Sequence, residues 1–290
     1  MNSILKETYT LSNRIKIPRL GLGTWLIEDK DVANVVRNAL SIGYRLIDTA
    51  EAYENEVGVG IGVKTSSLPR EEIFVTTKLK AEIKTYKEAK DAIEESLNKL
   101  DLGYIDLMLI HSPQPWKEVN QSDNRYHKGN KEAWKALEEA YFEGKIKSIG
   151  VSNFMIDDLE NIMEGAKVKP MVNQLLCHIS NTPSSLINYC KLNNILVESY
   201  SPIAHGEILN NPILIDMAKK YNVSVACLCI RYTLQLGTVS LPKSENPAHI
   251  KSNSEVDFVI SDEDMIKLEN IDRIDNYGSF SHFPVYGGKL

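Results

Sequence analysis

Four residues in this sequence have the types and spacing needed for acid–base chemistry on an oxygen atom. Asp48 ends the apolar run RLID, and Tyr53 follows it by five residues. Lys78 and His111 end two further apolar runs, FVTTK and LMLIH. If Lys78 and Asp48 approach the Tyr53 hydroxyl, the ammonium favours the phenolate and lowers the tyrosine pKa from about 10. The tyrosine would then be a general acid near neutral pH, with His111 orienting a carbonyl oxygen or relaying a proton.

Further polar residues stand at or just beyond the ends of later apolar runs. Asn153 follows SIGVS, Gln174 lies late in MVNQL, Tyr200 ends ILVESY, and Lys243 follows TVSLP. A buried charge costs several kcal/mol unless it is paired, so packing alone does not explain a ring of such groups. The pattern predicts that these side chains converge on one site.

Short strands alternate with amphipathic helices along the chain. We expect eight strands, near Leu20–Thr24, Arg45–Asp48, Ile73–Lys78, Ile105–His111, Lys147–Ser152, Met171–Leu175, Leu196–Tyr200 and Val239–Pro242. We expect helices at Asp31–Ile42, Tyr86–Leu100, Lys131–Phe142, Pro183–Leu192, Ile213–Tyr221 and Val225–Leu236. Several strands are nearly continuous apolar runs, as in parallel strands buried on both faces. This predicts an α/β fold, a single (β/α)8 TIM barrel over residues 1–290, with its active site at the carboxyl ends of the strands.

A six-stranded doubly wound sheet is the main alternative fold. Such sheets usually carry G-x-G-x-x-G directly after the first strand. Here Gly21 and Gly23 lead into Thr24 and Trp25 and not into a glycine-rich helix start. The missing fingerprint therefore favours the barrel.

A short hairpin precedes the first predicted barrel strand. Thr8–Leu11 and Ile15–Ile17 have strand-like composition and flank Ser12-Asn13-Arg14. We expect this N-terminal β-hairpin to cover the bottom of the barrel, where its role is packing.

The composition is that of an ordinary globular protein and excludes several classes. Of the 290 residues, 33 are Lys or Arg and 39 are Asp or Glu, which gives a net charge of −6. This mild acidity argues against a nucleic-acid partner, and no apolar run approaches the roughly 18 residues of a membrane span. The N-terminus lacks the basic start and apolar run of a signal peptide. We expect a cytoplasmic monomer without metal, whose four cysteines stay reduced: Cys177, Cys190, Cys227 and Cys229.

Eight motifs, in chain order and at predicted strand ends, resemble those of the aldo-keto reductases. The motifs are GLGTW at 21–25, IDTAEAYENE at 47–56, TTKL at 76–79, LIHSP at 109–113, IGVSNF at 149–154, NQ at 173–174, YSP at 200–202 and LPKS at 241–244. Within the family, the chain is similar to bacterial aldehyde and keto-sugar reductases such as the 2,5-diketo-gluconate reductases. The resemblance implies a TIM barrel that reduces aldehydes and ketones with a nicotinamide cofactor.

The resemblance also implies a catalytic role for Asp48, Tyr53, Lys78 and His111. Tyr53 would donate the proton, Lys78 and Asp48 would tune it, and His111 would position the carbonyl. The cofactor would supply the hydride, while the protein supplies orientation and charge.

A larger set of matching residues would contact the cofactor. Its members are Thr24, Trp25, Asp48, Ser152, Asn153, Gln174, Tyr200, Ser201, Pro202, Ile203, Lys243, Ser244, His249 and Asn253. The resemblance implies that Tyr200 stacks on the nicotinamide ring and that Ser152, Asn153 and Gln174 hold its carboxamide. Ser201 and its neighbours would cover the pyrophosphate, Lys243 and Ser244 would reach the adenosine phosphate, and Asn253 would contact the adenine.

One departure from the family pattern bears on the choice of cofactor. The family usually has an arginine six residues after the motif lysine, where it binds the 2′-phosphate of NADP. This sequence has His249 there, and Glu245 follows Ser244. Arginine stays charged, whereas histidine is mostly neutral near pH 7. Since Lys243 and Ser244 remain, we expect NADPH as the cofactor, with dual use of NADH.

A second departure concerns the substrate pocket. Many relatives have tryptophan directly after the strand-four histidine, and this chain has Ser112. We expect Trp116 to replace that aromatic wall, from the long polar segment Gln114–Asn130, because loops of this length are often functional. The predicted substrate contacts are Trp25, Tyr53, His111 and Trp116.

Three functions remain open at this point. The first is a carbonyl reductase acting on small aldehydes, α-dicarbonyls or keto sugars. The second is a cofactor-sensing binding protein that keeps the barrel but turns over little. The third is a TIM-barrel isomerase or lyase that uses Lys78 as a Schiff base, which would leave the SN, NQ and PKS motifs unexplained.

Overall fold

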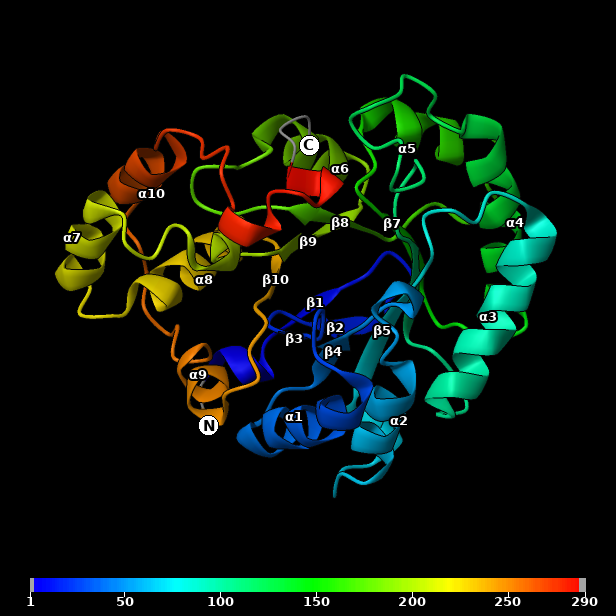
Figure 1. The fold of residues 1–290 in the computed structure, drawn as a ribbon, viewed down its shortest axis with the longest axis horizontal. Coiled ribbons are helices and arrows are strands. Elements are labelled where there is room, and N and C mark those ends of the chain that lie inside the picture. The colour runs from blue at the N-terminus through cyan, green and yellow to red at the C-terminus, as the bar shows by residue number, and fades with distance from the viewer. Residues whose placement is uncertain (1–2, 287–290) are drawn as a thin grey trace.

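Eight parallel strands form a nearly closed barrel in the computed structural model, which describes residues 3–286 (Figure 1). The strands are β3 (Leu22–Gly23), β4 (Leu46–Asp48), β5 (Phe74–Leu79), β6 (Leu107–Ile110), β7 (Ile149–Ser152), β8 (Val172–Leu176), β9 (Leu196–Tyr200) and β10 (Val239–Leu241). Strands that are neighbours in the sequence are also neighbours in the sheet, from β3 to β10. The predicted TIM barrel is therefore confirmed, and the doubly wound alternative is wrong.

The first and last strands meet through backbone hydrogen bonds. The Gly21 amide donates to the Ser240 carbonyl and the Gly23 amide to the Pro242 carbonyl, each at 3.0 Å. Gly21 has no room for a side chain, since a Cβ there would lie 2.6 Å from a Leu46 side-chain carbon. Glycine at this position thus allows the close approach on which closure depends.

Ten α-helices of the described chain surround the strands (Figure 1). They are α1 (Asp29–Ile42), α2 (Glu56–Lys64), α3 (Tyr86–Leu100), α4 (His127–Phe142), α5 (Ile156–Met163), α6 (Ser184–Leu192), α7 (Pro212–Lys220), α8 (Val225–Gln235), α9 (Pro247–Ser252) and α10 (Asp262–Glu269). All six predicted helices are present. The helices α2, α5, α9 and α10 were not expected, and α4 begins four residues before its predicted start. None of the helices in the described range is long and apolar enough to cross a membrane.

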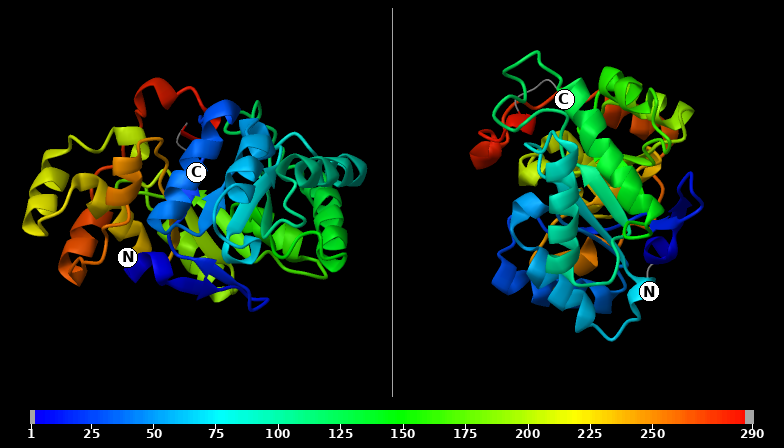
Figure 2. Two further views of the ribbon diagram at one scale, coloured as in Figure 1. Left: turned by 90° about the horizontal axis from the view of Figure 1, so that it is seen from below. Right: turned by 90° about the vertical axis from the view of Figure 1, so that its right-hand side faces the viewer.

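The predicted N-terminal hairpin is confirmed at the end of the barrel where the strands begin. Its strands β1 (Thr8–Thr10) and β2 (Lys16–Pro18) pair antiparallel. The Asn13 side chain in the turn donates to the Lys147 carbonyl at 2.9 Å, just before β7. Figure 2 (left) shows the hairpin and the C-terminal tail on opposite sides of the molecule. The hairpin thus lies away from the carboxyl ends of the strands.

Two segments cover the other end of the barrel. One is Gln114–Asn130, between β6 and α4, and the other is the tail that contains the 3-10 turns Gly278–Phe280 and Pro284–Tyr286. The Asn120 side chain donates to the Pro284 carbonyl at 2.7 Å and so links the two. The four cysteines are free and buried.

Candidate active site

The four predicted catalytic residues come together at the carboxyl ends of β4, β5 and β6. Asp48 ends β4, Lys78 lies in β5, His111 follows β6, and Tyr53 lies on the 3-10 turn Glu51–Tyr53 after β4. The Lys78 ammonium donates to both Asp48 carboxylate oxygens, at 2.9 and 2.7 Å. It also contacts the Tyr53 hydroxyl at 3.3 Å, and the Tyr53 and His111 rings meet edge-on with centroids 5.6 Å apart. One ammonium therefore joins the carboxylate to the phenol.

Burial shifts the pKa of Tyr53 in the direction opposite to the one expected from the sequence. Burial raises the pKa of Tyr53; the Lys78 ammonium opposes this rise and Asp48 adds to it. The expected lowering of the Tyr53 pKa is therefore wrong for this structure, because desolvation of the phenolate outweighs the lysine. The phenol is protonated at neutral pH and can act as a proton donor.

The pKa values of Lys78 and His111 shift in opposite directions. Burial alone would lower the pKa of Lys78, but Asp48 and Tyr53 outweigh it, and the net shift is upward. Burial and the nearby Lys78 ammonium hold the pKa of His111 well below its usual value. The ammonium is therefore charged and the imidazole neutral at pH 7. His111 Nδ1 has no hydrogen-bond partner within residues 3–286.

A cavity of about 660 Å³ opens above these residues. Its size falls in the usual range for a small-molecule or cofactor site. Most of the predicted site residues line it, namely Trp25, Asp48, Tyr53, His111, Trp116, Ser152, Asn153, Gln174, Tyr200, Ser201, Pro202, Ile203 and Lys243. Lys78 lies beneath this lining, fully buried and in contact with Asp48 and Tyr53.

Polar side chains at the centre of the cavity fit a nicotinamide ring with its carboxamide. The Gln174 amide nitrogen donates to Asp48 Oδ1 at 2.8 Å, which leaves the amide oxygen as its remaining polar atom. The Asn153 amide donates to the Ser152 hydroxyl at 3.1 Å and accepts from the Tyr200 hydroxyl at 2.8 Å. The Tyr200 ring borders the same cavity and offers a flat face for stacking.

The residues expected at the far end of the cofactor do not all border the cavity. Lys243 lines it, and its ammonium lies 2.6 Å from the Glu245 carboxylate. Ser244, His249 and Asn253 lie beyond the lining, at or near α9. Among these three, His249 is exposed and Asn253 is buried at the end of the helix.

Thr24, another predicted cofactor contact, is not among the residues that line the cavity. It is fully buried, and its hydroxyl donates to the Asp48 backbone carbonyl at 2.9 Å. Thr24 therefore supports the backbone of β4 from below the cavity lining.

Aromatic side chains form the walls of the cavity. The Trp116 and His111 rings meet edge-on with centroids 5.0 Å apart, and Trp116 lines the cavity. Trp25, which also lines the cavity, packs edge-on against Phe283 of the tail, with ring centroids 4.7 Å apart. The Tyr286 hydroxyl of the tail lies 3.0 Å from the Ser201 hydroxyl, where the resemblance implies the pyrophosphate.

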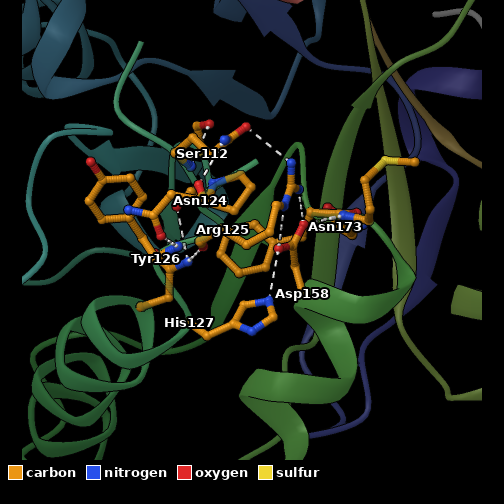
Figure 3. Close-up of polar contacts among 12 residues, drawn as sticks. Ser112, Asn124, Arg125, Tyr126, His127, Asp158 and Asn173 are labelled. Atoms are coloured by element: carbon orange, nitrogen blue, oxygen red, sulfur yellow. Dashed lines mark hydrogen bonds and ion pairs between the residues drawn. The ribbon is translucent and has the colours of Figure 1, made fainter. Parts of the chain in front are cut away.

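The segment that carries Trp116 is anchored by an ion pair between the half-buried Arg125 and the fully buried Asp158 (Figure 3). Both side-chain oxygens of Asp158, in α5, accept from the Arg125 guanidinium. Arg125 also donates to the Gln114 side chain at 3.0 Å, and Gln114 donates to two backbone carbonyls of the same segment. A bidentate pair of this kind fixes orientation as well as distance. The segment is therefore held at both its start and its end.

One group of side chains near this anchor has the composition of a metal site. Ligand atoms of His127, Asp157 and Asp158 lie within 4.8 Å of one another. Asp158 is already satisfied by Arg125, and His127 contacts it at 3.6 Å (Figure 3). The described contacts make this group an anchor for the loop.

The family resemblance also implies that the aromatic C-terminal tail packs near the mouth of the site, and Phe280, Phe283 and Tyr286 of that tail line the cavity. One feature of the site was missed at the sequence level. This is Glu198, which is fully buried in β9 and accepts a hydrogen bond from Gln174 at 2.8 Å. A signal for Glu198 was present, since it is the one acidic residue inside the apolar run ILVESY.

Comparison with known proteins agrees with the barrel fold. The family model described as "Aldo/keto reductase family" matches residues 19–273. The glyoxal reductase of Bacillus subtilis is 41% identical over 280 residues, which cover 96% of this chain and 97% of that protein. The methylglyoxal reductase DkgA of Escherichia coli is 38% identical, over 89% and 90% of the two chains.

A solved structure shows the same fold. The crystal structure of an aldo/keto reductase from Brucella melitensis superposes with a TM-score of 0.84 at 36% sequence identity. The match covers 92% of this chain and 99% of the other. From its matching residues and its barrel, the chain belongs to the aldo/keto reductase family.

Proposed function

We propose that the protein is an NADPH-dependent carbonyl reductase for small aldehydes, ketones and α-dicarbonyls. The observation that carries the proposal is the buried Lys78 ammonium, which contacts the Asp48 carboxylate and the Tyr53 hydroxyl beneath an open cavity. A buried charge of this kind needs a paired partner. Its second contact, with a phenol that faces the cavity, suits proton donation.

The residues of the chain supply the proton and the positioning. When bound, the reduced nicotinamide supplies the hydride that adds to the carbonyl carbon. The Tyr53 hydroxyl gives its proton to the carbonyl oxygen as negative charge develops there, so that the carbonyl becomes an alcohol. The Lys78 ammonium stabilises the phenolate that remains, and Asp48 holds the ammonium in place. The neutral His111 imidazole donates a hydrogen bond that orients the carbonyl oxygen.

The substrate class follows from the cavity walls and from the relatives. Trp25, Trp116 and the tail aromatics give an apolar mouth, which suits a small carbonyl compound. Relatives that match over most of their length are named glyoxal reductase and methylglyoxal reductase. Both names support an α-dicarbonyl as the first substrate to test.

NADPH is the proposed cofactor, with NADH as a weaker second. Lys243 and Ser244 support the preference, and a yeast relative is named glycerol 2-dehydrogenase (NADP(+)). The Lys243–Glu245 ion pair reduces the positive charge available to a 2′-phosphate, and His249 lacks the fixed charge of an arginine. These two features support dual use of the cofactors.

The proposal is tested by the initial rate of NADPH consumption with methylglyoxal, with a parallel NADH reaction. Consumption above the blank without substrate, and faster with NADPH, is the expected result. No consumption with methylglyoxal, other dicarbonyls or simple aldehydes would overturn the reductase function. Cofactor titration in that case distinguishes the alternative, a binding protein that senses the cofactor without turnover.

A further inference from the structure

We propose that Glu198 is a positioning residue that fixes the orientation of the Gln174 amide for the cofactor. The inference rests on the proposed function, because it concerns the nicotinamide carboxamide. Neither the resemblance nor the strand-end pattern assigns a role to Glu198.

The strand register places Glu198 directly beside Gln174. These two residues are register partners in the parallel pair β8 and β9. The Gln174 amide nitrogen donates to Glu198 Oε2 at 2.8 Å and to Asp48 Oδ1 at 2.8 Å. An amide nitrogen carries two hydrogens, so the two carboxyl groups use both of them. The nitrogen end of the amide is therefore held on two sides.

This arrangement determines which end of Gln174 faces the cavity. A flipped amide would direct its oxygen at the ionised Asp48 carboxylate, which offers only acceptors, and would lose both of these hydrogen bonds. Within residues 3–286, no donor reaches the Gln174 oxygen, although Gln174 lines the cavity. The amide thus presents a fixed acceptor to the cavity. The carboxamide of a nicotinamide ring carries an N–H group that suits it.

The burial of Glu198 supports a specific role over simple packing. Its side chain is fully buried, and one of its oxygens, Oε1, has no partner among the described residues. Burial and the neighbouring Asp48 carboxylate raise the pKa of Glu198 to about 8, with Gln174 and Lys78 acting in the other direction. A protonated Glu198 accepts from Gln174 through its carbonyl oxygen and leaves the Asp48–Lys78 pair balanced. Glutamine is therefore the residue closest in shape and charge to the protonated Glu198 side chain.

The test uses two variants of Glu198 and two cofactors. Glu198→Gln keeps an acceptor for the Gln174 amide, whereas Glu198→Met keeps the length of the side chain and removes the acceptor. NADP⁺ carries a carboxamide N–H, and its 3-acetylpyridine analogue carries a methyl ketone there. The dissociation constant of each is measured by quenching of tryptophan fluorescence, which does not depend on turnover.

The expected result is that Glu198→Met, unlike Glu198→Gln, no longer distinguishes NADP⁺ from its 3-acetylpyridine analogue. The wild type binds NADP⁺ about tenfold more tightly than the analogue, the value of one good hydrogen bond. Glu198→Gln keeps this ratio, and Glu198→Met brings it close to one by weakening NADP⁺ alone. Gln174→Met, which removes the acceptor itself, gives the same ratio as Glu198→Met.

Other results overturn the inference. If Glu198→Met weakens both cofactors equally, or keeps the tenfold ratio, Glu198 only fills space. Thermal melts confirm folding, and Glu198→Leu replaces Glu198→Met if the latter does not fold. If the wild type binds neither cofactor, the proposed function itself is wrong and the inference falls with it. Binding by the wild type with unchanged discrimination in the variants overturns the inference alone.

Discussion

Two opposing effects act on the pKa of the Tyr53 hydroxyl, and together they suit a proton donor. Burial favours the neutral phenol, and the Lys78 ammonium at 3.3 Å favours the phenolate. The ammonium therefore limits the cost of losing the proton, while burial keeps the proton in place until a substrate oxygen can accept it. His111, held neutral by burial and by Lys78, adds a hydrogen-bond donor without a second positive charge.

Removal of the Lys78 ammonium tests how much the buried Asp48–Lys78 pair contributes to the free energy of unfolding. Lys78→Met leaves the Asp48 carboxylate buried without a counter-charge, and we expect a loss of about 3–5 kcal/mol in unfolding free energy. Urea denaturation measures it. Lys87→Met is the matched control, since Lys87 pairs with Asp91 at the surface and is expected to cost less than about 1 kcal/mol. Equal losses in the two variants would contradict the buried pair.

Cofactor preference is also set by single residues. His249→Arg adds a fixed charge where the family binds the 2′-phosphate, so we expect about tenfold tighter binding of NADPH and little change for NADH. Fluorescence titration of both cofactors measures the two constants. Equal effects on NADPH and NADH would show that His249 does not lie at that site. His282→Arg, in the exposed tail, controls for added charge.

Sequence reasoning located the polar side chains at strand ends well, because a barrel brings all such ends to one face. It gave the wrong sign for the Tyr53 pKa, because desolvation depends on how completely the phenol is covered. It missed Glu198, whose partner Gln174 lies on a neighbouring strand and is matched to it by register. Its assignment of Thr24 to the cofactor stays a prediction, and in the structure the buried Thr24 hydroxyl donates to the Asp48 carbonyl.

At the scale of elements, the predictable helices were those with a regular apolar stripe. Helix α3 begins and ends where predicted, and the Thr85 side chain caps it by accepting from the Glu88 amide. Helix α2 was missed because its sequence, EVGVGIGVK, contains three glycines, which weaken helices. The structure explains the glycines, and two of them make the closest contacts. A Cβ on Gly58 would lie 2.2 Å from the Asp29 carbonyl oxygen, and one on Gly60 would lie 2.1 Å from that of Leu100. Close packing against α1 and α3 requires them.

The anchor of the 114–130 segment should affect the substrate more than the cofactor. Arg125→Met breaks the pair with Asp158 and loosens Trp116, which packs against His111. We expect the KM for methylglyoxal to rise about tenfold, with NADPH affinity unchanged within about twofold. Steady-state kinetics and cofactor titration measure the two. The control is His127→Gln, which leaves the Arg125–Asp158 pair intact and should leave the KM near the wild-type value. An unchanged KM in Arg125→Met would contradict a role for the anchor.

At the scale of the whole molecule, buried histidines link stability to pH. Burial lowers the pKa of His178 and of His205 to about 4, and burial together with the Lys78 ammonium holds that of His111 well below its usual value. Each is neutral in the folded state and binds a proton in the unfolded state below about 6.5. Their stabilisation is therefore complete above pH 6.5 and is lost as the pH falls toward 4.

The size of this effect is measurable at His178, which lies between the Ile179 carbonyl and the Tyr277 hydroxyl. We expect it to account for about 3 kcal/mol of unfolding free energy between pH 6.5 and pH 4. Urea denaturation of wild type and His178→Asn across this range should show a shallower slope in the variant. The exposed His282→Gln serves as the control. A slope equal to that of the wild type in His178→Asn would contradict the assignment.

The central claim is that Tyr53 donates the proton in a reduction driven by a bound nicotinamide. The most direct measurement is the single-turnover rate of NADPH oxidation by Tyr53→Phe with methylglyoxal, together with its NADPH dissociation constant. Because the hydroxyl acts in the transition state, we predict a rate about 10²–10⁴-fold below wild type and cofactor binding unchanged within about twofold. A variant that turns over at the wild-type rate would contradict the account.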